Sequence, residues 1–151
     1  GTNSNNVAHG SAGLTLAKAL TVYEAFGAGD IPDDGQRYFV VSSAGWADLL
    51  QIDQFSRAEY VGENDLPYAG GLTAKRWLGF MWFTHSGLTL SGSNRDCHAY
   101  HKSAVGLAMG SDIRTEVNYI PEKVSNLITS YMSMGAVEID GEGMIQCIIA
   151  E

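Results

Sequence analysis

The aromatic run at residues 76–83 constrains the fold of this 151-residue chain most strongly, because it places two tryptophans and two phenylalanines within eight residues. Side chains of a β-strand point alternately to the two faces of a sheet, so such a strand needs apolar cover on both sides. We predict one strand over residues 75–84, with Gly79 marking a bulge. A small domain covers one face more easily than two. We therefore expect part of this strand, or of residues 131–134, to be buried against a neighbouring molecule.

The remaining segments predict an α+β fold with mixed and antiparallel sheets. Helical spacing of apolar residues indicates a helix over residues 14–26, with Thr15 as its N-cap and Gly27, Gly29 and Pro32 ending it. Ser42 or Ser43 caps a short second helix that reaches Leu50. Residues 102–109 fit either a helix or a strand, and residues 51–71 and 87–96 are expected to be loops. Further strands are predicted over residues 38–41, 99–101, 112–119, 124–134 and 144–149.

Composition limits the possible classes of function. The net charge is −8, with 17 acidic against 9 basic residues, which argues against nonspecific binding to nucleic acid or to an anionic membrane surface. No stretch approaches the roughly 20 apolar residues of a membrane span. Two cysteines do not form a disulfide framework, so we expect a reducing, intracellular compartment. The chain opens on Gly1 and not on methionine, and we expect it to be a fragment with a flexible lead-in at residues 1–13.

Histidines and cysteines raise the question of a metal site. Cys97 and His98 are adjacent, and His101 follows three residues later. On a strand, His98 and His101 point to opposite faces and do not converge on one ion. The other candidate ligands, His9, His85 and Cys147, lie in unrelated segments, whereas structural zinc sites use four ligands in short paired spacings. We predict no metal site and no cofactor.

The sequence also lacks the common catalytic motifs. The sequence has no Gly-x-Ser-x-Gly nucleophile elbow, and residues 91–93 (Ser-Gly-Ser) indicate only a loop. Asp30, Asp33 and Asp34 lie close together, but their spacing does not match a calcium loop, and a solvated turn explains them better. No glycine-rich phosphate-binding pattern occurs. We therefore predict no catalytic, cofactor-binding or metal-binding residue, and no enzymatic activity.

A series of weak motifs nevertheless occurs in a telling order. A helix runs into a Gly-Asp-x-Pro turn, a hydrophobic strand enters a short helix, an isolated Phe and Tyr follow, and three more segments complete the series. These motifs are residues 14–26, 29–35, 37–50, Phe55 and Tyr60, then residues 75–80, 99–108 and 134–137. In order and spacing they resemble the second half of the tailed-bacteriophage major capsid (coat) protein family.

The resemblance implies a fold fragment with a spine helix and two domains. Residues 14–35 and 110–135 would belong to a peripheral domain, and residues 36–109 and 136–151 to an axial domain. It also implies a structural virion protein of a phage or prophage, synthesised in the bacterial cytoplasm. Copies of the full-length protein would self-assemble in capsomers into an icosahedral head enclosing DNA, with a scaffolding protein as a further expected partner.

The departures from the family are informative. Its N-terminal arm and extended loop have no counterpart here, so we expect the isolated chain to be a monomer or weak oligomer. We expect no membrane partner and no specific nucleic-acid sequence as a partner. One alternative is an encapsulin-like shell protein, which would bind a cargo protein. Another is a small cytoplasmic α+β enzyme or binding module, with a pocket near residues 51–71 and with His98 and His101 as its best candidates.

Overall fold

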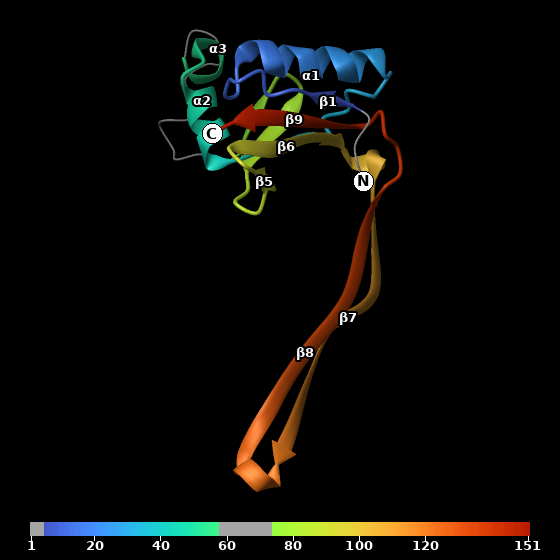
Figure 1. Cartoon of the computed structure of the whole chain (residues 1–151). Helices are drawn as coiled ribbons and strands as arrows, with labels where there is room; N and C mark the ends of the chain where they lie inside the picture. Colours follow the sequence, from blue (N-terminus) through green and yellow to red (C-terminus); the bar gives the residue numbers. More distant parts are fainter. Residues whose placement is uncertain (1–4, 58–73) are drawn as a thin grey trace.

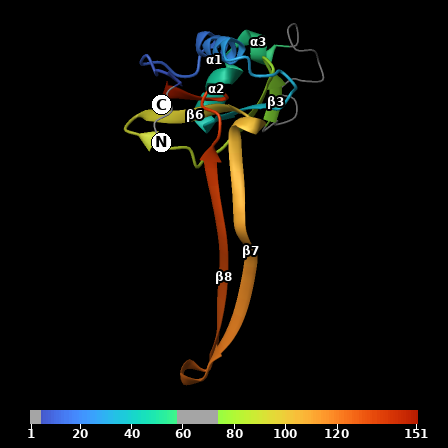
Figure 2. The same ribbon diagram turned by 90° about the vertical axis from the view of Figure 1, so that its right-hand side faces the viewer.

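The computed structural model describes residues 5–57 and 74–151, which form a compact body and a long arm (Figures 1 and 2). The body contains a seven-stranded mixed sheet. Six strands follow the order β1-β9-β6-β2-β4-β3, and the seventh, β5, pairs with the first two residues of β6. In chain order the strands of the body are β1 (Asn6–Val7), β2 (Arg37–Val41), β3 (Ala74–Trp77), β4 (Phe80–Thr84), β5 (Leu90–Ser91), β6 (Asn94–His101) and β9 (Met144–Ala150).

Three helices, α1 (Leu16–Ala28), α2 (Ser43–Leu50) and α3 (Asp53–Ser56), lie over one face of this sheet (Figure 1). The arm consists of β7 (Val105–Ile120), the short 3-10 helix η3 (Pro121–Lys123) and β8 (Ser125–Glu138). A second 3-10 helix, η2 (Lys102–Ala104), connects β6 to the arm. The observed mixture of helices and sheets confirms the predicted α+β class.

The hydrophobic core lies between the helices and the covered face of the sheet. Burial alternates along β2, β6 and β9, as expected for strands with one covered face. Phe26 of α1 contacts Phe80 of β4 edge to face, with ring centroids 5.1 Å apart. The fully buried side chains of the sheet include Phe39, Val41, Phe80, Trp82, Cys97, Ala99, Cys147 and Ile149.

The aromatic run forms a hairpin and not the single strand that we predicted. Leu78 and Gly79 both have positive φ, 50° and 76°, which is the geometry of a two-residue turn of the kind that suits β-hairpins. The chain therefore reverses, and Trp77 becomes the cross-strand partner of Phe80. This reversal places Trp77, Phe80 and Trp82 on one face, so the covered side of the sheet accommodates all three.

Thr15 is confirmed as the first helix cap, and of the two candidates for the second cap the structure selects Ser42. The Thr15 hydroxyl accepts a hydrogen bond from the backbone N–H of Lys18, and the Ser42 hydroxyl accepts one from Gly45. The first helix runs two residues further than predicted and ends at Ala28, with Gly29 as its C-cap.

The loops contain more structure than we predicted. Residues 53–56 form α3, whose Phe55 is fully buried. Within residues 87–96, β5 pairs with β6, which begins at Asn94 and is longer than the predicted strand at residues 99–101. Tyr60 and residues 58–71 of the predicted loop lie outside the described residues.

The segment before α1 is held on the sheet. β1 pairs with β9 in parallel register, Asn6 with Gln146 and Val7 with Cys147. The Lys18 ammonium donates to the carbonyls of His9, Ala12 and Gly13 at 2.6–2.9 Å and to that of Ile148 at 3.3 Å. Within residues 1–13, which we predicted as a lead-in, residues 5–13 thus make ordered contacts with the body.

Candidate assembly interface

The arm is the most unusual part of the molecule. β7 is 16 residues long, and at about 3.4 Å per residue it extends roughly 50 Å. Its strands pair antiparallel from Val105–Glu138 at the base to Ile120–Ser125 at the tip, with two register shifts between Met109 and Arg114. Among the described residues, no other element lies along the arm beyond its base (Figures 1 and 2).

One face of the arm carries large apolar side chains near its base and near its tip, with the hydrogen-bonded pair Thr115 and Ser130 between them. Register partners on an antiparallel ladder share a face, so Met109 and Met134 lie together near the base, and Val117 and Ile128 lie together near the tip. The side chains of this face are between 53% and 67% exposed. We call the apolar face the set Leu107, Met109, Ile113, Val117, Tyr119, Ile128, Met132 and Met134.

The opposite face is more polar. Arg114 pairs with Tyr131 and Glu116 pairs with Thr129, and the Tyr131 hydroxyl donates to Glu116 Oε1 at 3.1 Å. Asn118 lies on the same face. The predicted alternation of Ile113, Val117 and Tyr119 against Arg114 and Glu116 is therefore confirmed, although neither face is buried within the chain.

An arm of this composition is not a self-sufficient structure. A two-stranded hairpin is only marginally stable in water without a further layer against its apolar face. Soluble monomers rarely expose continuous apolar patches of more than a few hundred Å². The apolar face is therefore a candidate interface. The sequence signal for it was present as two consecutive alternating strands joined by a short Pro-containing turn, but only residues 131–134 of it were predicted to meet a neighbour.

The second face of the body's sheet carries a smaller aromatic cluster. Tyr38 stacks on Tyr100 with centroids 5.5 Å apart and meets Phe83 edge to face at 6.5 Å. These side chains are half-buried, as is Met81, whereas Phe80 and Trp82 on the covered face are fully buried. Part of the aromatic run thus stays partly exposed. Its burial against a neighbouring molecule stays a prediction.

The candidate metal ligands do not converge. His98 and His101 lie on opposite faces of β6, as predicted, since His101 is buried on the helix side with Cys97 while His98 lies on the other face. Burial lowers the pKa of His98, and its Nδ1 has no hydrogen-bond partner. In residues 5–57 and 74–151, no group of three or more His, Cys, Asp and Glu side chains is placed to hold a metal.

The two cysteines are register partners on β6 and β9, and both are fully buried as free thiols. Burial raises the pKa of Cys97 to about 11 and that of Cys147 to about 12. Thiols that stay protonated are poor nucleophiles and poor metal ligands. Their environment is that of core residues.

The acidic turn after α1 binds protein groups. Asp33 lies 4.0 Å from the buried guanidinium of Arg37. Asp34 Oδ1 lies 3.1 Å from His101 Nε2. The two carboxylates thus have separate partners, which accounts for the turn without an ion.

His101 also brings together the three residue types of a nucleophile triad, which the sequence did not predict. Its Nδ1 lies 2.7 Å from the Ser103 hydroxyl, and its Nε2 faces Asp34. The backbone N–H of Ser103 donates to the same Nδ1 at 3.3 Å, which makes the imidazole a cap for η2. Because His101 is 5% exposed and serves as a cap, we interpret the cluster as structural.

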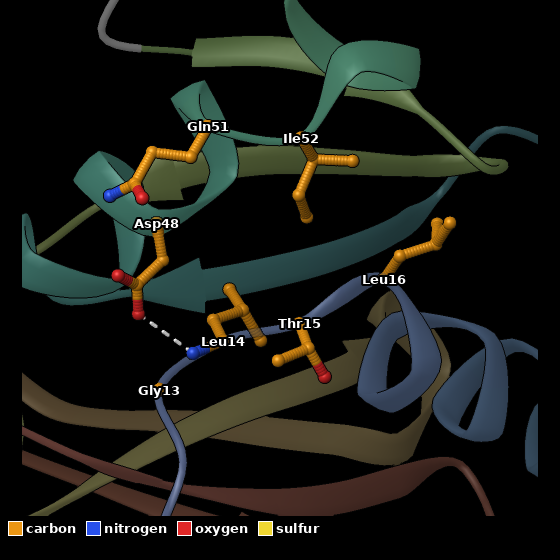
Figure 3. Close-up of a pocket in the computed structure, with 7 residues that line it drawn as sticks. All are labelled: Gly13, Leu14, Thr15, Leu16, Asp48, Gln51 and Ile52. Atoms are coloured by element: carbon orange, nitrogen blue, oxygen red, sulfur yellow. Dashed lines mark hydrogen bonds between the residues drawn. The ribbon is translucent and has the colours of Figure 1, made fainter.

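A shallow depression of about 260 Å³ lies where the start of α1 meets α2 (Figure 3). Its carboxylate, Asp48, accepts the backbone N–H of Leu14 at 2.8 Å. A Cβ on Gly13 would lie 2.1 Å from Asp48 Oδ2, so Gly13 permits this close approach. The depression includes Gln51 and Ile52 from the region where an alternative pocket was expected, but its one charged group already serves the fold.

None of the helices in the described part of the chain is long and apolar enough to cross a membrane.

Three solved structures are similar to this chain in fold. The chain resembles a structure from Mycobacterium phage Che8 with a TM-score of 0.76 at 16% identity, over 96% of this chain and 53% of that one. It resembles a capsid structure of cyanophage P-SCSP1u with a TM-score of 0.67 at 18% identity, over 94% and 48%. The capsid of an empty GTA particle gives 0.67 at 17% identity, over 97% and 50%. The chain thus spans about half the length of these proteins.

Among curated proteins, no sequence matches this chain significantly. A family model described as phage capsid protein matches residues 1–151. The fold similarity agrees with that match, and both agree with the resemblance found in the sequence. The chain belongs to the phage capsid protein family, whose members are structural proteins of the virion shell.

Proposed function

We propose that this chain is the shell-forming part of a phage major capsid subunit and that the arm carries a principal assembly contact. The observation that carries the proposal is the apolar face, whose eight large side chains are all more than half exposed. Burying apolar surface drives most protein association, at roughly 25 cal/mol per Å². A face of this length therefore contributes substantially once another part of the shell covers it.

The domain assignment is part of the same proposal. We propose that residues 110–135 belong to a peripheral domain that reaches across the shell, and that the sheet belongs to an axial domain near the capsomer axis. α1 packs against the sheet through Ala19, Val22 and Phe26. Residues 14–28 therefore group with the axial part better than with residues 110–135, and we revise the expected boundary accordingly.

The partners and location follow from this proposal. The subunit associates with other copies of itself in capsomers around enclosed DNA, after synthesis in the bacterial cytoplasm, with a scaffolding protein as a further partner. The net charge of −8 supports a wall that does not adhere to packed DNA. Alone, the chain is a monomer or weak oligomer without a membrane partner or a specific nucleic-acid sequence. It acts by assembly and not by catalysis.

The test compares the two faces of the arm in the full-length polypeptide expressed in bacteria. Val117→Lys and Ile128→Lys place a charge on the apolar face, and Asn118→Lys and Thr129→Lys are matched controls on the opposite face. We expect the first pair to stay soluble but to form no shells by electron microscopy, whereas the controls assemble. Equal assembly of all four variants would contradict the proposal.

A further inference from the structure

The direction of the arm relative to the body depends on a small joint. The joint comprises residues 102–104 on one leg and residues 139–143 on the other, between the last paired residues of the sheet and the first of the arm. Among the described residues, no element supports the arm beyond this joint (Figures 1 and 2). A small change of angle at the joint therefore displaces the tip of the arm much further than it displaces the base.

Backbone hydrogen bonds connect the two legs. Ala104 O accepts hydrogen bonds from the N–H of Ile139 at 2.8 Å and from that of Asp140 at 3.4 Å. The N–H of His101 donates a hydrogen bond to Gly143 O at 2.9 Å. A Cβ on Gly143 would lie 2.6 Å from Ala104 Cβ, so the legs are in close contact. These bonds hold the legs together, and the bond from His101 also joins residue 143 to the end of β6.

The His101 side chain connects the joint to the body. It is 5% exposed at the end of β6, and its ring bridges Asp34 in the turn before β2 and Ser103 in η2. A backbone N–H can only donate, so Nδ1 accepts from the Ser103 N–H. The ring proton is then on Nε2, which donates a hydrogen bond to Asp34 Oδ1. This one imidazole therefore connects Asp34 of the body with Ser103 of η2.

The turn that receives this bond is itself held in place. Asp34 Oδ1 accepts the backbone N–H of Gln36 at 2.9 Å, and Asp34 Oδ2 accepts the Gln36 side-chain amide at 3.0 Å. Gln36 O accepts the N–H of Lys102 at 3.1 Å, which adds a second connection to the joint. Arg37, the register partner of His101, is also buried. The turn is therefore a fixed support on the body.

We propose that His101 is the positioning residue that sets the direction of the arm on the body, acting through Asp34 on one side and Ser103 on the other. In the shell this contact would give every subunit one arm direction, a consequence that rests on the proposed assembly function. The positioning role itself is a property of the single chain.

The test measures the arm direction in unassembled full-length polypeptide by pulsed electron–electron double resonance. Spin labels on Glu24→Cys in α1 and Lys123→Cys at the tip report the distance, because Cys97 and Cys147 are buried. We expect one narrow peak in the parent chain. We expect a shifted mean and loss of the narrow peak in His101→Asn, whose amide can cap η2 but does not reach Asp34.

Three further variants make the test specific. Asp34→Ala, at an exposed position, should reproduce the shift even where His101→Asn lowers folding yield. His101→Gln, whose amide nitrogen can reach Asp34, should restore much of the narrow peak. His98→Asn, on the same strand and opposite face, should leave the distribution unchanged.

An unchanged distribution in both His101→Asn and Asp34→Ala would overturn the proposal, as would an equal shift in His98→Asn or no recovery in His101→Gln. Because the distances come from unassembled chains, these results are independent of whether shells form. A variant with a shifted arm that still builds normal shells would leave the positioning role standing and remove its proposed consequence for assembly.

Discussion

The indole of Trp82 in β4 lies nearly parallel to the ring of Phe39 in β2, with centroids 4.0 Å apart and planes inclined by 11°. The two residues are register partners on parallel strands, so their side chains leave the same face of the sheet. Trp82 Nε1 donates to Trp77 O at 2.9 Å, which satisfies the polar atom of the indole. This contact attaches the β3–β4 hairpin to the central strand.

Replacing Trp82 with alanine should therefore be severely destabilising. The side chain is fully buried, and large-to-small substitutions of this type cost about 3–5 kcal/mol through lost contacts and the cavity left behind. Urea unfolding followed by fluorescence and circular dichroism measures the change. Met81→Ala, one residue away on the half-buried face, is the control and should cost clearly less. Equal losses in the two variants would show that the covered face is not the main core.

Lys18→Met should loosen the segment before α1. The variant keeps the length of the side chain but removes the ammonium group, which makes hydrogen bonds to four backbone carbonyl oxygens. Leaving such acceptors unsatisfied costs about 1–3 kcal/mol. We expect faster amide hydrogen exchange at residues 5–13 and at the paired residues of β9, measured by mass spectrometry. Lys102→Met, at an exposed site, is the control. Unchanged exchange in residues 5–13 would show that β1 is held by other contacts.

Asp34 should make the free energy of unfolding depend on pH in the acid range. The hydrogen bond with His101, followed by that from the Gln36 backbone, lowers the pKa of Asp34 below its ordinary 3.8. The unfolded chain therefore binds more protons near that pH. The contribution of Asp34 to stability is present at pH values above the ordinary pKa of an aspartate. It is lost as the pH falls through the lower pKa that Asp34 has in the folded chain. Unfolding midpoints between about pH 5 and about pH 2 should fall less in Asp34→Asn.

The Arg95–Glu151 pair acts in the same direction, because the hydrogen bond from Arg95 also lowers the pKa of Glu151. Asp34→Asn should therefore reduce the acid dependence without abolishing it. Glu24→Gln on the exposed side of α1 serves as the control. If Asp34→Asn and the parent chain lose stability in parallel over this range, the His101–Asp34 contact has no role in it.

Cys97 and Cys147 should be unreactive in the folded chain. Burial raises their pKa values to about 11 and about 12, so the thiolate fraction at about pH 8 is at least a hundredfold below that of an exposed cysteine. Ellman's reagent should label neither thiol in buffer and both in guanidinium chloride. An introduced Glu24→Cys thiol provides the fast reference. Rapid labelling of either native cysteine would indicate that β6 and β9 separate readily.

Local patterns predicted much of the secondary structure correctly. The sequence predicts Thr15 as one cap and Ser42 or Ser43 as the other, because a hydroxyl before a helix accepts a hydrogen bond from an N–H of the first turn, only three residues away. The alternation at residues 113–119 was recognised because it depends only on strand periodicity. The opposite orientation of His98 and His101 followed from the same rule. The family resemblance also came from the ordered series of such local motifs.

Non-local packing decided the rest. Whether residues 75–84 continue as one strand or reverse at Leu78 and Gly79 depended on whether one face or two could be covered, and the helices cover only one. His101 and Asp34 meet across 67 residues of sequence, which no spacing rule anticipates. Alternation in β7 and β8 specified which side chains share a face, because that is local geometry. Only the tertiary structure showed that this apolar face has no cover within the described chain, because cover depends on where every other element lies.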